Sequence, residues 1–127
     1  MPLYDGEHFN PPAPVAEVVL RCPQTGTRVA NVVMLLDTGA DVTLVPRQAV
    51  ERAGVQPLPD RQCELIGFDG SRSLSHVVVL DMILLGRAFR GRYVLIDQPR
   101  GVVGRDVLNH LSIAMKGPAL EWTELSV

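Results

Sequence analysis

The sequence contains little of several residue types that mark common functional classes. Only two of its 127 residues are cysteines, and Cys22 and Cys63 form neither a Cys-x-x-Cys pair nor another spacing typical of metal ligands. Aromatic residues make up 5% of the chain. No apolar run approaches the roughly 18 residues that a transmembrane helix needs. From these absences we expect no metal site, no cofactor and no membrane partner.

The charges are few and nearly balanced. The chain has 12 basic and 14 acidic residues and a formal net charge of -2, so no overall attraction to nucleic acid is expected. Arg87, Arg90 and Arg92 surround Gly91 in a predicted turn. We interpret them as a solvated rim rather than a phosphate site, because aromatic stacking partners are almost absent. The first residues lack the basic and apolar regions of an export signal, which favours a cytoplasmic location.

What the sequence does contain indicates an all-β domain. Hydrophobic residues make up 46% of the chain, enough for one core, and 11 glycines and 10 prolines predict frequent turns and short strands. Residues 1–14 are rich in proline and are expected to form an extended arm, followed by a single domain over residues 15–127. Strands and hairpins are predicted at 15–21, 28–36, 63–80, 81–85, 92–96 and 112–123, and short helices at 46–54 and 106–111.

The most informative segment is the end of the second predicted strand. Residues 32–36 are apolar without alternation, which predicts a strand buried on both faces, and Asp37, Thr38 and Gly39 follow at once. A carboxylate at the edge of a core is costly unless another group pairs with it or uses it. Gly39 permits close approach of another chain or a ligand. On this motif alone, an Asx turn in which Asp37 bonds nearby N–H groups is an equally good interpretation.

Two further segments favour a functional interpretation. The sequence Leu-Leu-Asp-Thr-Gly-Ala-Asp at 35–41 resembles the active-site motif of the retroviral-type aspartic proteases, the retropepsins. Residues 101–108 resemble the second signature of that family, an apolar pair followed by Gly-Arg-Asp, and a glycine-bounded tip at 66–70 lies where the family has its flap. The three features occur in the family's order. The resemblance implies a closed all-β barrel with one or two short helices and a flap hairpin.

The resemblance also implies roles for individual residues. Asp37 would be the catalytic aspartate, Thr38 would bond across a dimer, and Gly39 would bond a bound peptide together with its neighbours Ala40 and Asp41. The flap that would close over the substrate consists of Ile66, Gly67, Phe68, Asp69 and Gly70.

Three more residues complete the expected site. Arg100 and Val102 match the loop that lines the pocket beside the scissile bond, and Arg105 would support the site through an ion pair with Asp41. The flap tip departs from the family in carrying Asp69, a charge that we expect to face solvent.

The chemistry of this family requires two aspartates, and the chain has one Asp-Thr-Gly. One carboxylate must act as base toward the attacking water and the other as acid toward the carbonyl. A second chain related by a two-fold axis would supply the missing carboxylate, which predicts a homodimer. Leu120, Trp122 and Leu125 alternate with polar residues in the last hairpin, which we expect to contribute to the dimer contact rather than only to cover its own subunit.

The sequence thus predicts an aspartic endopeptidase that acts as a homodimer on extended peptides. A catalytically silent module that keeps the fold and grips a peptide strand is the alternative, because a fold alone does not establish an activity.

Overall fold

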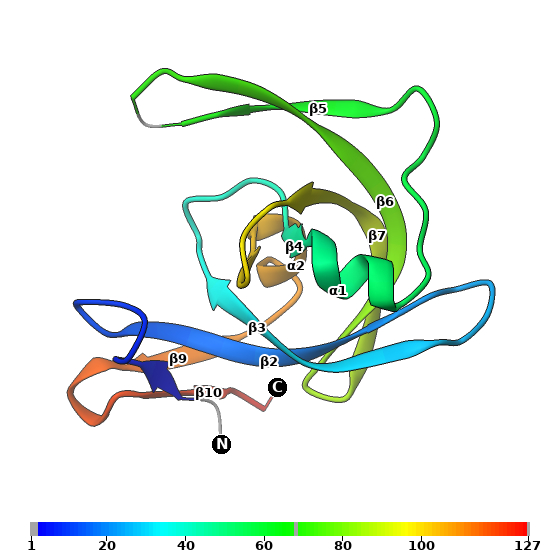
Figure 1. Ribbon diagram of the computed structural model, residues 1–127. Helices are drawn as coiled ribbons and strands as arrows, with labels where there is room; N and C mark the ends of the chain where they lie inside the picture. The colour runs from blue at the N-terminus through cyan, green and yellow to red at the C-terminus, as the bar shows by residue number, and fades with distance from the viewer. Residues whose placement is uncertain (1–2, 68, 127) are drawn as a thin grey trace.

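The computed structural model in Figure 1 describes residues 3–67 and 69–126. The described residues are mostly in strands, with two short α-helices and one 3-10 turn among them, which confirms the predicted all-β class. The strands are β1 Tyr4–Asp5, β2 Ala13–Arg21, β3 Arg28–Leu36, β4 Leu44–Pro46, β5 Gln62–Ile66, β6 Arg72–Leu84, β7 Arg87–Ile96, β8 Gly101–Val103, β9 Ile113–Lys116 and β10 Glu121–Glu124. The helices are α1 Arg47–Arg52, α2 Arg105–Leu108 and the 3-10 turn η1 Gly117–Ala119.

One large sheet holds most of the strands. Its order is β1-β2-β3-β8-β4-β7-β6-β5, and β2 also pairs with β6. This second pairing joins the two halves of the sheet, so that β2, β3, β8, β4, β7 and β6 form a closed ring of neighbours around the core. Strand β8 lies between β3 and β4, parallel to the first and antiparallel to the second. The chain between β3 and β4 must therefore loop around the end of β8.

Strand β3 buries one face rather than both. Val32, Met34 and Leu36 are buried, whereas Val33 and Leu35 between them are only half-buried. The prediction of a strand buried on both faces was wrong, because Val33 and Leu35 lie on the outer face of the sheet and stay partly exposed to solvent. That face is continuous with the outer face of β2, since Val33 pairs with Glu17.

The flap and the central hairpin share one long strand. Where the sequence predicted two strands, β6 runs unbroken for 13 residues; its first part pairs with β5 and its second part with β7. The turn into β7 is only Leu85-Gly86, and both residues have positive φ, as tight two-residue hairpins require. Arg87 and Arg90 consequently lie in β7 and not in a turn around Gly91.

Segments near both ends of the described chain pack against β2. The segment 1–14, expected as an arm outside the domain, folds back where it is described: Tyr4 and Asp5 pair with Pro14 and Ala13. The β9–β10 hairpin packs nearby, and Trp122 is 2% exposed and donates its indole N–H to the carbonyl of Val15 at 2.8 Å. Trp122 therefore covers its own subunit, contrary to its expected place in a dimer contact.

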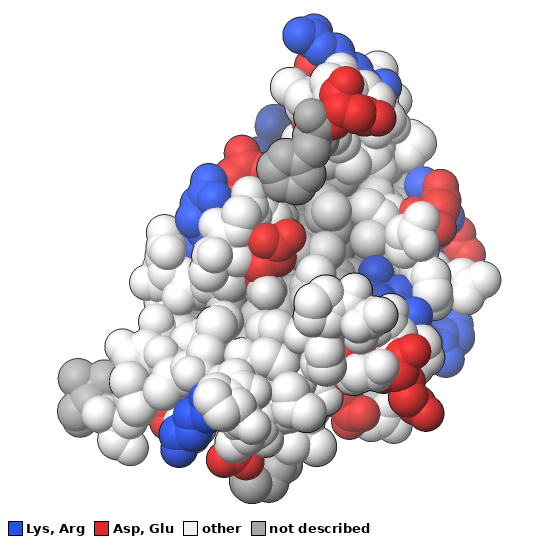
Figure 2. Space-filling view, turned by 90° about the vertical axis from the view of Figure 1, so that its left-hand side faces the viewer, with Lys and Arg blue, Asp and Glu red and all other residues white. Residues whose placement is uncertain are grey.

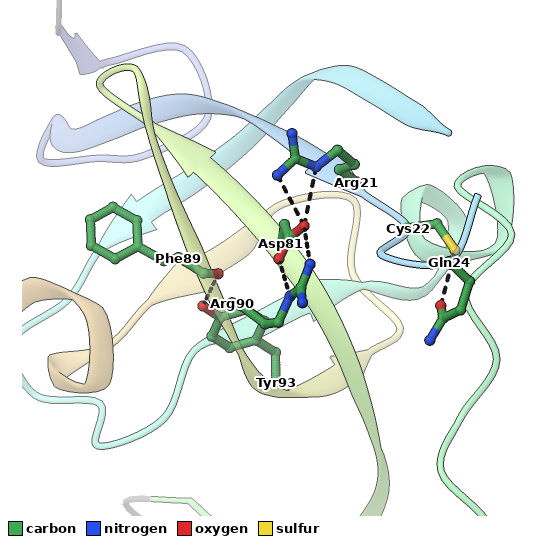
Figure 3. A network of polar contacts seen from close by, with 7 residues as sticks. All are labelled: Arg21, Cys22, Gln24, Asp81, Phe89, Arg90 and Tyr93. Carbon is green, nitrogen blue, oxygen red and sulfur yellow. Dashed lines mark hydrogen bonds and ion pairs between the residues drawn. The ribbon is translucent and has the colours of Figure 1, made fainter. Parts of the chain in front are cut away.

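A buried carboxylate ties the ring together where β2 meets β6. Asp81 on β6 is 2% exposed and accepts hydrogen bonds from Arg90 on β7 and Arg21 on β2 (Figure 3). Close by, the hydroxyl of Tyr93 donates to the carbonyl of Phe89 at 2.7 Å, and burial raises its pKa. No helix among the described residues is long and apolar enough to span a membrane.

Candidate active site

The Asp-Thr-Gly segment begins the loop that passes around the end of β8. Strand β3 ends at Leu36, and the backbone N–H of Asp37 donates to the carbonyl of Val103 at 3.0 Å, which continues the β3–β8 pairing by one residue. The loop then runs to β4 and lies on the left of the molecule in Figure 1. The position of Asp37 is thus set by the core strand before it and by β8 beside it.

The carboxylate of Asp37 is half-buried and only partly bonded. Its Oδ1 accepts the backbone N–H of Gly39 at 2.8 Å, and the N–H of Ala40 donates to the carbonyl of Asp37 at 3.2 Å. This is the Asx turn that the sequence allowed. Within the described residues Oδ2 makes no hydrogen bond, so the turn orients the carboxylate and leaves one oxygen available. A Cβ on residue 39 would lie 3.0 Å from Oδ1, which explains why glycine fits there.

Arg105 supports the loop by a route that the sequence did not predict. Its side-chain Nη1 donates to the carbonyl of Thr38 at 2.7 Å, and its backbone N–H donates to the carbonyl of Ala40 at 2.8 Å. The ion pairs found among the described residues do not include the expected one with Asp41, whose side chain is exposed. The guanidinium of Arg105 therefore bonds the carbonyl of Thr38. The carboxylate of Asp41 is exposed and is solvated by water instead.

The second contact between this loop and α2 involves two residues that sequence reasoning missed. Thr43 is completely buried; its hydroxyl donates to Asp106 Oδ1 at 2.6 Å and its N–H donates to Oδ2 at 3.0 Å. The same hydroxyl accepts the N–H of Gly104 at 3.1 Å. An acidic residue in the first turn of a helix was visible in the sequence, but its partner 63 positions earlier was not.

Two glycines around β8 make this packing possible. A Cβ on residue 104 would lie 2.6 Å from the carbonyl oxygen of Val42 and 2.9 Å from that of Ala40. A Cβ on residue 101 would lie 2.4 Å from the carbonyl oxygen of Leu44. Since these neighbours are backbone atoms, no side-chain movement relieves the clash.

The expected flap is a hairpin of β5 and β6, and two backbone hydrogen bonds join the residues at its end. The N–H of Gly67 donates to the carbonyl of Ser71 at 2.9 Å, and that of Gly70 donates to the carbonyl of Gly67 at 3.0 Å. Asp69 is exposed, as expected, and accepts the N–H of Ser71; bonding to Ser71 holds the pKa of this carboxyl below its usual value. Ile66 is 64% exposed at the end of β5. Phe68 lies outside the described residues.

The two residues expected beside the scissile bond lie in different surroundings. Val102 is half-buried in β8, paired with Leu35 of β3 next to the active-site loop. Arg100 lines a cavity of about 180 Å³ together with Asn31, Gln48 and Arg52, between β3 and α1. The structure thus places Val102 and Arg105 next to the loop that carries Asp37, whereas Arg100 lines a separate cavity.

Comparison with known proteins identifies the family and the fold. Residues 25–107 match the sequence model of a family described as aspartyl protease. Among solved structures, the EIAV protease complexed with the inhibitor HBY-793 is similar with a TM-score of 0.58 and 23% identity, over 77% of this chain and 86% of that chain. No curated protein matches the sequence. The chain therefore belongs to the aspartyl protease family and has the retropepsin-like fold.

Proposed function

We propose that this protein is an aspartic endopeptidase that works as a homodimer, in which each chain contributes Asp37. The observation that carries the proposal is the environment of Asp37. The residue is half-buried, the N–H of Gly39 orients its carboxylate through Oδ1, and Oδ2 accepts no hydrogen bond from a described residue. A purely structural Asx turn does not require the backbone of Arg105 and a buried Thr43–Asp106 contact to hold the loop in place.

A second copy is needed because the chemistry requires two carboxylates. Brought together by a two-fold axis, the Asp37 side chains would share one proton, one removing a proton from water and the other protonating the carbonyl of the substrate. The exposed side chain of Thr38 lies beside Asp37 at the same surface. Its carbonyl is held by Arg105, which fixes the loop that would meet its copy.

The face that would receive the second chain carries little charge. The tip of the β5–β6 hairpin, the β3–β4 loop and the β9–β10 turn all lie on the left in Figure 1. Figure 2 shows this face, where charged side chains are scattered over a mostly uncharged surface. At the terminal elements three apolar side chains, those of Met115, Leu120 and Leu125, are each about half exposed. These residues, rather than Trp122, are the proposed contacts.

The proposed substrate is an extended peptide held under the flap. Ile66 and Leu74 are 64% and 66% exposed on opposite strands of the hairpin, which suits contact with apolar side chains near the scissile bond. An extended chain can also bond the backbone of the active-site loop.

The test is cleavage of a diverse peptide mixture by the wild type and by Asp37→Asn, with new termini identified by mass spectrometry between acid and neutral pH. Asn keeps the shape and the bond to Gly39, so we expect the variant to fold and dimerise without cleaving. Asp60→Asn is the matched control, since Asp60 is exposed and has a positive φ that asparagine tolerates. Cleavage by Asp37→Asn would overturn the proposal. Peptide binding without cleavage by the wild type would favour the silent module.

A further inference from the structure

A groove on the far side of the molecule from the flap has no part in the proposed catalysis. It has a volume of about 750 Å³ and is lined by residues 3–7, 15–17 and 84–85 with Val33 and Trp122. We call it the acidic groove. Figure 1 shows the elements around it, β1, β2, β10 and the β6–β7 turn, at the opposite end from the β5–β6 hairpin. A ligand in it would leave the active-site loop accessible.

The walls of the acidic groove are held by the protein's own backbone. The N–H of Tyr4 donates to the carbonyl of Leu120 at 3.0 Å, and that of Val15 donates to the carbonyl of Leu3 at 3.1 Å. The indole N–H of Trp122 donates to the carbonyl of Val15. The groove is therefore preformed, and its volume falls within the range of about 300–1,000 Å³ that is usual for ligand sites.

The charge of the acidic groove has one sign. Asp5, Glu7 and Glu17 line it, and no Lys, Arg or His is among the described residues of its lining. Asp5 is engaged within its own turn, where it accepts the N–H of Glu7 at 2.9 Å and contacts His8 Nδ1 at 2.9 Å. Glu7 and Glu17 are exposed and take part in none of the ion pairs among the described residues. Two carboxylates thus lie beside an apolar floor, and no described residue of the lining supplies a cation for them.

We propose that the acidic groove binds an extended protein segment in which Lys or Arg alternates with apolar residues. The floor of Val15, Val33 and Leu84 would take the apolar side chains, and Glu7 and Glu17 would take the cations at the rim. Complementary charge of this kind selects the partner more than it strengthens binding. The segment belongs to a partner protein, because the groove lies away from the flap and the active-site loop.

The proposal is tested with a blocked peptide, Leu-Arg-Leu-Arg-Leu-Arg-Leu, and its counterpart with Glu in place of Arg. Binding is measured by isothermal titration calorimetry on the Asp37→Asn protein, so that the result does not depend on catalysis. We expect the basic peptide to bind and the acidic one not to bind. Raising the salt concentration from about 0.05 M to about 0.5 M should weaken binding, since charges at an exposed rim are screened.

The groove is distinguished from a general charge effect by two double variants. Glu7→Gln with Glu17→Gln should weaken binding about tenfold, the sum expected from two exposed ion pairs. Glu51→Gln with Asp60→Asn changes the net charge equally at exposed positions outside the groove and should leave binding unchanged.

Three results would overturn the proposal: no binding of the basic peptide, equal weakening by both double variants, or a groove variant that alters only the dimer dissociation constant. The last would assign the groove to a second copy of the chain. If the wild type does not cleave peptides, the proposed function is refuted, but the binding result for the acidic groove is unaffected.

Discussion

Replacement of Asp81 by asparagine removes the charge that joins three strands of the ring. The carboxylate is 2% exposed; Arg90 Nε donates to Oδ1 at 2.7 Å, and Arg21 Nε donates to Oδ2 at 3.1 Å. Arg21 belongs to β2 and Arg90 to β7, so Asp81 bonds both neighbours of β6 at the pairing that closes the ring (Figure 3). We expect Asp81→Asn to lower the free energy of unfolding.

The size of the loss follows from what remains after the substitution. Breaking a buried ion pair by removing one partner costs about 3–5 kcal/mol when the other charge stays buried. Here the side chains of Arg21 and Arg90 are 28% and 63% exposed, so water can solvate them, and asparagine keeps one carbonyl acceptor. We therefore expect a loss of about 2 kcal/mol at neutral pH.

The pH dependence of this difference has a definite sign. The hydrogen bond from Arg90, followed by that from Arg21, holds the pKa of Asp81 below its ordinary value of 3.8, although burial acts in the opposite direction. A carboxyl with a lowered folded-state pKa stabilises the fold above its unfolded value and loses that contribution as the pH falls through the folded value. The gap between wild type and Asp81→Asn should be constant near neutrality and shrink below pH 3.8.

The assay is urea unfolding followed by the fluorescence of Trp122, the one tryptophan of the chain, at several pH values. Asp97→Asn is the control: Asp97 pairs with Arg47 at 2.6 Å but its side chain is 78% exposed, so its loss should cost no more than about 1 kcal/mol. Equal unfolding midpoints for Asp81→Asn and wild type at neutral pH would refute the reasoning, as would a gap that widens in acid.

The other predictions concern the supports of the active-site loop. Thr43→Val should lower the free energy of unfolding by about 2 kcal/mol because it leaves Asp106 without the hydroxyl, whereas Thr43→Ser should be milder. Gly104→Ala should unfold more easily than Gly117→Ala in the same urea assay, since only the first would place a Cβ against backbone. Arg105→Ala should lower the kcat of peptide cleavage by a larger fraction than the urea midpoint of unfolding, because its guanidinium bonds the exposed active-site loop. Equal fractional decreases in kcat and in the unfolding midpoint would contradict this.

The features that the sequence predicted correctly are those encoded by neighbouring residues. The strand before Asp37, both short helices and the flap hairpin follow from apolar runs, proline, glycine and short polar side chains within a few positions. The Asx turn at Asp37 was one of the two interpretations that the sequence left open. The resemblance to the family also predicted that the start of α2 lies against the Asp37 loop. The hydrogen bond from the backbone N–H of Arg105 to the carbonyl of Ala40 agrees with this prediction.

The features that it missed depend on contacts between distant residues. Nothing near Thr43 indicates Asp106, and nothing near Arg105 indicates that its guanidinium bonds a carbonyl rather than Asp41. The unbroken length of β6 is set by pairing to three different strands. Trp122 has the pattern of an interface anchor, but β2 buries it within the chain.

In the proposed enzyme each active site needs Asp37 from two chains. Wild type and Asp37→Asn are mixed, dissociated and reassociated in different proportions at constant total concentration, and the rate of peptide cleavage is measured. If both carboxylates are required, the rate follows the square of the wild-type fraction, so an equal mixture has about one quarter of the wild-type rate. A rate that falls in proportion to the wild-type fraction, to roughly one half in the equal mixture, would contradict a shared site.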